Sequence, residues 1–195
     1  KPVRRARAVD PAAIATAAID LLDQGGFRAL TVRAVAGRIA VAPASLYSRV
    51  NSVDDVFDLA LDAALGRDPE IQKALAQADI HVLLIEYYHH LVRHPWACQV
   101  IGMRAPRGPN YLRFSERMIQ LLSEMQVSAP LATAYALSNF VIGCATTASA
   151  ANDEPEASID NSLAPIYAQL HAVQDKTPEQ IVEAGLSALI ALWSQ

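Results

Sequence analysis

The chain has 195 residues, of which 52% are apolar and 18% charged, and its formal net charge is -4. This length and composition are sufficient for a sizeable core and suit one or two domains. Cys98 and Cys144 are isolated thiols without C-x-x-C spacing, which argues against a disulfide framework or a cysteine zinc site and fits a reducing cytosol.

The net charge hides an asymmetry along the chain. Residues 1–50 hold eight basic and three acidic side chains, whereas residues 51–195 hold eight and seventeen. A basic first segment on an acidic remainder indicates that only the first part faces a polyanion. The basic start, Lys1, Arg4, Arg5 and Arg7, is not followed by an apolar segment, so we expect a cytoplasmic protein and not a secretory signal. These four residues are expected either to contact the phosphates or the minor groove of DNA, or to form a disordered basic tail.

The first predicted helix follows Asp10 and Pro11, a capping residue and a first-turn proline. The helix ends at the Gly25-Gly26 pair. Its apolar stripe consists of Ile14, Ala18, Leu21 and Leu22. We expect this helix to support the two that follow it.

Two short helices are predicted on either side of a tight turn between Thr31 and Val50. Thr31 is the natural N-cap of the first, and Pro43 suits the first turn of the second. Leu46 and Val50 are expected to point inward. The first helix carries Arg33 and Arg38 opposite an apolar stripe formed by Val32, Val35, Ala36 and Ile39. This arrangement predicts a helix-turn-helix whose outer residues face a DNA groove.

The residue pattern of this region resembles the TetR family of bacterial repressors. The resemblance rests on Leu30-Thr31-Val32-Arg33, then Val41-Ala42-Pro43-Ala44-Ser45-Leu46-Tyr47, then Arg49-Val50. It covers about the first third of the chain. Two positions depart from the family pattern: Ala40 stands where members usually carry Gly, and Val53 stands where they usually carry a phosphate-binding Lys.

The resemblance and the helix faces predict the residues that contact DNA. Arg33, near a helix N-terminus, is expected to bind guanine O6 and N7, with a solvated surface charge as the alternative. Ser45 and Tyr47 are expected to bind phosphate oxygens and Arg49 to add a charge, while Tyr47 alternatively packs in part against the core. The predicted DNA-binding set is Thr31, Arg33, Pro43, Ala44, Ser45, Tyr47, Arg49 and Ser52.

The remainder of the chain is also predicted to be helical. Ser52-Val53-Asp54-Asp55 resembles a capping box and begins a helix over 52–65. This helix links a predicted DNA-binding domain, 1–52, to an effector-binding and dimerisation domain, 66–195. Further helical patterns cover about 70–92, 96–103, 109–126, 130–151, 163–173 and 178–194. No alternating strand pattern competes, so the expected fold is all-α.

The segment from Met125 to Asn152 carries no charged residue or histidine. Its length alone is enough to span a bilayer. Pro130 interrupts it, its polar content is high, and no basic cluster flanks it. We therefore predict a helix buried among other helices and no membrane partner.

The second half of the chain resembles the ligand domain of the tetracycline repressor at Ala134-Tyr135-Ala136-Leu137-Ser138 and Gly143-Cys144. In such proteins the last long helices of two subunits pack as a four-helix bundle, which implies a homodimer through 130–151 and 178–194. Small residues that permit close approach are Ala132, Ala136, Gly143 and Ala150, and the expected apolar stripe on the last helix is Val182, Leu186, Leu189 and Trp193.

Aromatic and polar residues in the helices where the family places its pocket predict a mixed apolar effector site. Core packing is the alternative for each of them. The predicted ligand-binding set is Tyr87, His90, His94, Trp96, Met103, Phe114, Met118, Asn139, Phe140 and Thr147. Among these, Trp96, Met103, Phe114 and Asn139 are favoured.

Two places in this domain bear on metal binding. Glu86, His90 and His94 share one helical face, a spacing compatible with zinc and an outside ligand. The resemblance points away from a metal, because Val100 stands where the tetracycline repressor has a metal-binding His and Thr147 where it has an acidic residue. We expect neither metal nor cofactor, and no magnesium-tetracycline complex as ligand.

These features predict a ligand-responsive repressor that binds a palindromic operator as a dimer and is released by a small apolar or aromatic effector. No Gly-rich phosphate loop, G-x-S-x-G or recognisable carboxylate pair indicates an enzyme. One alternative is a helical small-molecule-binding protein, metal-binding protein or enzyme with a vestigial helix-turn-helix. Another is an architectural DNA-binding protein, which predicts no buried pocket.

Overall fold

The computed structural model describes residues 9–153 and 159–193, so Lys1, Arg4, Arg5 and Arg7 lie outside it. Across the described ranges the protein is helical and has no strand, which confirms the all-α expectation. The helices are α1 (Pro11–Gly25), the 3-10 turn η1 (Phe27–Ala29), α2 (Val32–Arg38), α3 (Pro43–Leu46), α4 (Val53–Arg67), α5 (Pro69–Gln77), α6 (Ile80–Arg93), α7 (Pro95–Met103), α8 (Pro109–Glu124), α9 (Pro130–Asp153), α10 (Pro165–His171) and α11 (Pro178–Trp193).

Local caps explain the boundaries of the first helices. The Asp10 carboxylate accepts from the Ala12 N–H at 2.9 Å, and the Thr31 hydroxyl accepts from the Ala34 N–H at 3.0 Å. Gly26 ends α1 with a φ of 64°, a conformation that glycine adopts without a steric penalty. These caps fix the starts of α1 and α2, which pack against each other through their buried faces.

The segment expected to form one helix over 70–92 forms two, so that prediction is wrong. The Asp68 carboxylate accepts from the N–H groups of Glu70 and Ile71 and begins α5. The Asp79 carboxylate accepts from the Val82 N–H at 2.9 Å and begins α6. A capping Asp inside a helix-compatible pattern therefore divides it.

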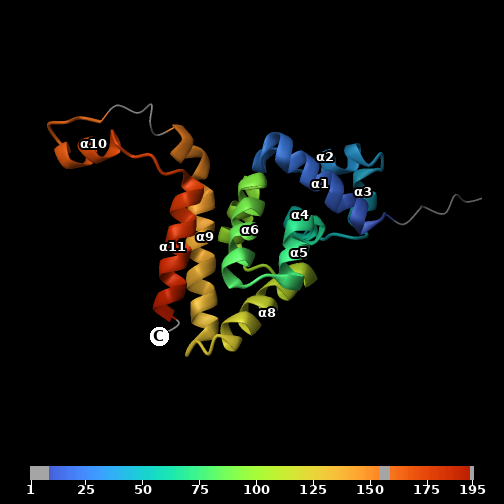
Figure 1. The fold of residues 1–195 in the computed structure, drawn as a ribbon. Helices are drawn as coiled ribbons and strands as arrows, with labels where there is room; N and C mark the ends of the chain where they lie inside the picture. Colours follow the sequence, from blue (N-terminus) through green and yellow to red (C-terminus); the bar gives the residue numbers. More distant parts are fainter. Residues whose placement is uncertain (1–8, 154–158, 194–195) are drawn as a thin grey trace, which may run out of the picture.

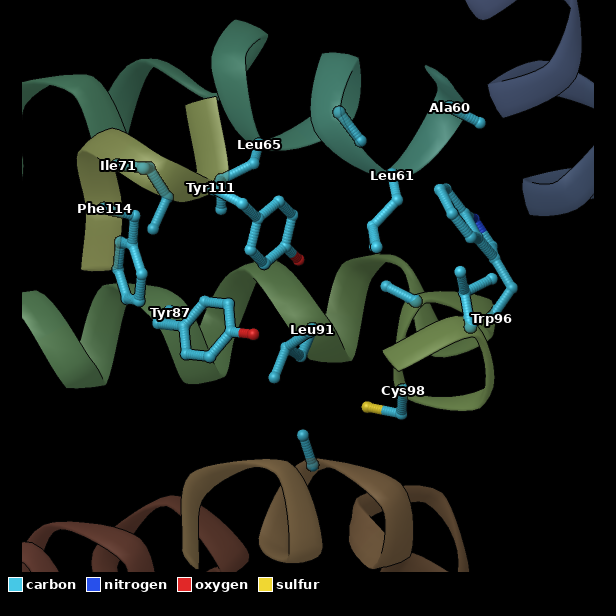
Figure 2. Close-up of a cluster of buried hydrophobic side chains, with 14 of the residues drawn as sticks. Ala60, Leu61, Leu65, Ile71, Tyr87, Leu91, Trp96, Cys98, Tyr111 and Phe114 are labelled. Atoms are coloured by element: carbon cyan, nitrogen blue, oxygen red, sulfur yellow. The ribbon is translucent and has the colours of Figure 1, made fainter. Parts of the chain in front are cut away.

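One continuous core connects the two halves of the protein. Figure 2 shows Leu61 and Leu65 of α4 above α6, with Tyr111 and Phe114 of α8 beside them. The rings of Tyr87 and Phe114 lie 4.6 Å apart between centroids. Helix α4 therefore packs on α1 with part of its surface and on the second half of the protein with another part.

Helices α9 and α11 lie side by side at the edge of the molecule away from α2 and α3 (Figure 1). Segment Pro130–Ala150 of α9 is long and apolar enough to cross a membrane by length and composition. One face of the segment packs in the core through Leu137, Val141 and Ala145, but 33% of its apolar window is buried within the chain, so the expectation of a helix buried among other helices is wrong for its other face. A single helix of this length and composition is weak evidence for a membrane span.

The stripe predicted on the last helix does not face outward. Val182 and Leu186 are buried within the chain, and Leu189 and Trp193 pack partly against the same core. The exposed face of α11 is instead the one that carries Ile181, Ala184, Ala188 and Leu192. The periodicity predicts an apolar stripe, but α11 uses it to pack against α9 and α6 of the same chain.

Candidate functional site

The predicted DNA-reading residues lie on the short helices α2 and α3 and directly after them. Arg33 and Arg49 are exposed, and 57% of Tyr47 is exposed, so Tyr47 is not a core residue. None of these three side chains makes a hydrogen bond or ion pair with the described part of the chain. Arg38, in contrast, donates to Gln24 at 2.9 Å and is therefore held on α1. The group of unpaired polar side chains is suited to a partner outside the molecule.

The remaining predicted DNA-binding residues shape this surface. Thr31 and Ser52 are N-caps of α2 and α4, and each hydroxyl accepts a backbone N–H. Pro43 and Ala44 are exposed at the start of α3, and Ser45 is half-buried. The two caps therefore have a structural role in the protein, and the proposed contact with DNA is additional to it.

A cavity of about 520 Å³ lies between α7, α8 and α9. Tyr87 closes it from α6. The lining residues are Tyr87, Ile101, Gly102, Met103, Arg104, Ala105, Pro106, Arg107, Tyr111, Leu112, Phe114, Ser115, Met118, Ile119, Leu131, Ala134, Tyr135, Ser138, Asn139 and Ile142. Its size matches the usual range for small-molecule sites.

Two phenols form an uncharged wall of this cavity. Burial raises the pKa of Tyr87 and of Tyr111 far above the usual value of 10, so both phenols stay neutral. The two rings meet edge to face with centroids 6.4 Å apart (Figure 2). The wall therefore offers aromatic faces and no anionic group.

The structure brings together only part of the predicted ligand-binding set. Tyr87, Met103, Phe114, Met118 and Asn139 line the cavity. His90, His94, Trp96, Phe140 and Thr147 are not among its lining residues. The cavity is thus nearer the α7–α8 segment than the prediction implies.

Each of the five residues outside the cavity has another environment. The Trp96 indole N–H donates to Asp23 of α1 at 2.6 Å, and His94 Nδ1 lies 2.8 Å from the same carboxylate oxygen. Phe140 fills the space at Gly185, where an added Cβ would lie 2.2 Å from its ring. The Thr147 hydroxyl donates back to the Gly143 carbonyl at 3.2 Å.

His90 has a buried partner instead of a ligand. Its Nδ1 lies 2.8 Å from Asp68, which also accepts from Arg93 at 2.5 Å. Burial raises the pKa of Asp68, but the bonds from His90 and Arg93 outweigh burial and hold that pKa well below 3.8. Glu86 lies beside His89 and not beside His90 or His94, and the described residues contain no group of three potential metal ligands.

Helix α4 has polar ties to both sides of the molecule that the sequence does not reveal. The Arg67 guanidinium donates to the Thr16 hydroxyl of α1 at 2.7 Å. The Asp62 carboxylate accepts from the N–H groups of Asn110 and Tyr111, which caps α8. The pairs are far apart in sequence, so no local pattern identifies them.

Comparison with known proteins agrees with both halves of this arrangement. Residues 14–58 match the model described as bacterial regulatory proteins, tetR family. Residues 74–176 match that of the tetracyclin repressor-like C-terminal domain. The chain belongs to the TetR family.

Two curated relatives of this TetR family protein are transcriptional regulators by name. One is an HTH-type transcriptional regulator of Saccharopolyspora erythraea, 37% identical over 77% of this chain. The other is the HTH-type transcriptional repressor DrrR1 of Streptomyces coeruleorubidus, 27% identical over 68% of this chain. This chain spans 66% and 51% of their respective lengths.

A solved structure shares the fold of this TetR family protein over nearly its whole length. It is the Streptomyces coelicolor TetR family protein ActR in complex with (S)-DNPA, with a TM-score of 0.76 and 22% identity. The alignment covers 96% of this chain and 98% of that one. At this identity the similarity establishes the fold alone.

Proposed function

We propose that this TetR family protein is a ligand-responsive repressor that binds a palindromic DNA operator as a homodimer. Residues 1–52 form the DNA-reading unit in this proposal, α4 is the link, and residues 66–195 bind the effector and the second subunit. An effector in the cavity lowers the affinity for the operator. The name of DrrR1, a transcriptional repressor, supports the direction of regulation.

The observation that carries the proposal is the group of exposed, unpaired side chains on α2, α3 and the residues after them. Arg33 stands in the first turn of α2, where its guanidinium has access to a guanine edge. Tyr47 and Arg49 follow the buried Leu46, and their side chains are suited to binding phosphate oxygens of DNA. The net charge of +5 over residues 1–50 favours the same polyanionic partner.

A second subunit is proposed because apolar side chains remain exposed on neighbouring helices. On α11, Ile181 is 47% and Leu192 64% exposed, and on α9 Leu131 and Tyr135, which also line the cavity, are each 60% exposed. Helix α10, which projects beyond the end of α9 (Figure 1), exposes Ile166 and Leu170. Covering these surfaces in a two-fold dimer suits an interface of more than ~2,000 Å² in total.

The cavity supports effector control of DNA binding. Aliphatic and aromatic side chains make up most of its lining, and Ser115, Ser138 and Asn139 add neutral polar groups. ActR, which has this fold, was solved with the small molecule (S)-DNPA. A ligand regulates DNA binding only if it binds two states of the dimer with different affinities. These states must differ in the distance between the two recognition helices, which fit operator half-sites about 34–36 Å apart.

Selection of bound fragments from a random DNA pool, with purified protein, tests the DNA-binding function. The expected result is an enriched palindrome whose binding is lost in the Arg33→Ala, Arg49→Ala double variant. Arg113→Ala, which removes an exposed arginine of α8, is the control and is expected to bind normally. Failure to enrich any sequence would favour the alternative of a small-molecule-binding protein with a vestigial helix-turn-helix.

Effector release is tested on the selected operator with chelator present throughout. A small-molecule library is screened for compounds that dissociate the complex, and active compounds are expected to work without added magnesium. Release that requires added magnesium would contradict the proposed metal-free site.

A further inference from the structure

The effector cavity is lined by positively charged side chains, although the domain around it is acidic. Arg104 and Arg107 are the charged side chains among the described residues that line the cavity, and the lining includes no carboxylate. Arg104 is paired with carboxylates of α4 outside the lining, so Arg107 supplies the uncompensated positive charge. Both arginines belong to a part of the chain, residues 51–195, with a net charge of -9. A positively charged site in an acidic domain points to an anionic ligand.

Arg107 stands on a loop that separates two hollows. Together with Pro106 and Tyr111 it lines both the effector cavity and a cleft of about 320 Å³ on the other side of the loop. Its guanidinium donates to the Pro106 carbonyl at 3.2 Å, and it has no carboxylate partner recorded within the described ranges. Arg107 therefore has hydrogen-bond donors free for a ligand.

Arg104 has partners, and both lie on α4. Its Nη2 lies 2.6 Å from the Asp54 carboxylate and its Nη1 donates to Asp58 at 2.9 Å. Asp54 and Asp58 are one helical turn apart, so one guanidinium joins the end of α7 to the first half of α4. This half of α4 directly follows the DNA-reading unit and is the part closest to it in sequence.

We propose that the cavity takes an acidic aromatic effector whose anionic group binds Arg107 and draws Arg104 away from Asp54 and Asp58. The aromatic part of the effector packs on Tyr87, Phe114 and Met118, and a carboxylate, sulfonate or enolate faces the two arginines. The binding half of this inference concerns the cavity alone. The regulatory half, release of α4 as the signal to the DNA-reading unit, rests on the proposed function.

Competition for Arg104 concerns its end-on pair of donors, because Nη1 and Nη2 together commit two of the five N–H donors to carboxylates of α4. A guanidinium binds an oxyanion best through two parallel N–H donors, and Arg104 already uses Nη1 and Nη2 on different carboxylates. An anion that takes either donor weakens one tie to α4. The Asp58 side chain of its ion pair with Arg104 is about half exposed, so solvent screens this pair. Replacing Asp58 by an anionic ligand therefore costs little free energy.

Two fluorescent probes that differ by one anionic group test the binding half. The probes are 8-anilino-1-naphthalenesulfonate and its neutral counterpart N-phenyl-1-naphthylamine, titrated into the protein without DNA. We expect the sulfonate to bind about tenfold more tightly, because charge-assisted hydrogen bonds contribute more than neutral contacts. Arg107→Gln and Arg104→Gln are each expected to reduce this preference, and Arg113→Gln to leave it unchanged.

A preference that survives both substitutions, or equal binding of the two probes by the wild-type protein, would overturn the inference. Since Arg107 is exposed on a loop, its substitution is not expected to impair folding. The readout needs no operator, so its failure is distinguishable from a failure of the proposed DNA-binding function.

The competition between the anion and the Arg104 ion pairs with α4 is tested with the same sulfonate probe. Asp58→Asn loosens Arg104 and is expected to tighten probe binding about two- to fivefold, the range for a screened ion pair. In the Arg104→Gln background, Asp58→Asn is expected to have no effect. An equal effect in both backgrounds would show that Asp58 does not act through Arg104 and would contradict the competition.

Discussion

Ala40 turns the chain between α2 and α3 with a φ of 55°, in the left-handed region where a Cβ is unfavourable. The family usually carries glycine here, and the structure supplies the physical reason. Ala40→Gly is expected to raise the free energy of unfolding by about 1 kcal/mol, measured by urea denaturation. Ala132→Gly, at an exposed position within α9, is the control and is expected to lower it by about 0.5–1 kcal/mol. Destabilisation by Ala40→Gly would show that the turn carries no strain.

His90 is expected to make stability depend on pH. Burial lowers its pKa below the usual 6.5, since the hydrogen bond to Asp68 opposes burial only in part. The unfolded chain binds a proton near pH 6.5 and the folded chain binds it only at lower pH, so the contribution of His90 is fully present above pH 6.5 and is lost as pH falls below that value. The loss is at most about 1.4 kcal/mol per pH unit.

Thermal denaturation between pH 7.5 and 5.5 checks this expectation. Asp68 contributes nothing to the slope in that window, because the stability that it provides is lost only when pH falls below about 3.8. His90→Gln is expected to flatten the slope, whereas His81→Gln, which removes a half-exposed histidine, is expected to leave it unchanged. The same slope in wild type and His90→Gln would contradict the assignment.

Individual elements were predictable to the extent that their signals are local. Asp10, Thr31 and Ser52 mark helix starts that the structure confirms, because a cap acts on residues two or three positions away. The cavity was harder to predict, since periodicity shows which side chains face inward but not which of them border a void. Trp96 faces inward yet bonds to Asp23, 73 positions away in sequence.

Helix α8 is expected to depend on a cap supplied by α4. The Asp62 carboxylate accepts from the N–H groups of Asn110 and Tyr111 and from the Asn110 side chain at 2.8 Å. Asp62→Ala leaves these donors without partners and is expected to lower the free energy of unfolding by about 1–2 kcal/mol. Asp175→Ala, an exposed change before α11, is the matched control. Equal stabilities of the two variants in urea would exclude this role for Asp62.

The two arginines of the proposed DNA-reading unit are expected to act differently. Arg33→Ala is expected to relax specificity at one operator position at a cost of about 1–3 kcal/mol. Arg49→Ala is expected to weaken binding to all sequences alike and to reduce the salt dependence by about one counterion. Binding to a set of single-base operator variants at several salt concentrations separates these effects. Identical losses for both variants, independent of sequence, would refute the assigned roles.

At the scale of the whole molecule, α4 contacts both the proposed DNA-reading unit and the helices that line the cavity. Arg67 binds it to α1, Arg104 to the end of α7, and Asp62 to the start of α8. Two of these ties reach the cavity wall and one reaches the DNA-reading unit. If a ligand displaces the 104–109 loop as proposed, these side-chain bonds and the core both connect that displacement to α4.

The proposed dimer is expected to depend on the outward face of α11. Ala188 is exposed between Ala184 and Leu192 on that face. Ala188→Glu places two like charges in a two-fold interface, one from each subunit, and is expected to cost several kcal/mol of association free energy. Such a cost raises the dissociation constant by more than about 100-fold. Sedimentation at micromolar concentration is therefore expected to show a dimer for wild type and a monomer for Ala188→Glu.

The control for this experiment is Ala76→Glu, which adds the same charge at an exposed position of α5 and is expected to remain dimeric. Far-ultraviolet circular dichroism of both variants checks that each is still helical. A wild-type monomer would refute the dimer itself. A dimeric Ala188→Glu protein would instead show that two copies associate through another surface, because an uncompensated pair of carboxylates buried in an apolar two-fold contact is strongly unfavourable.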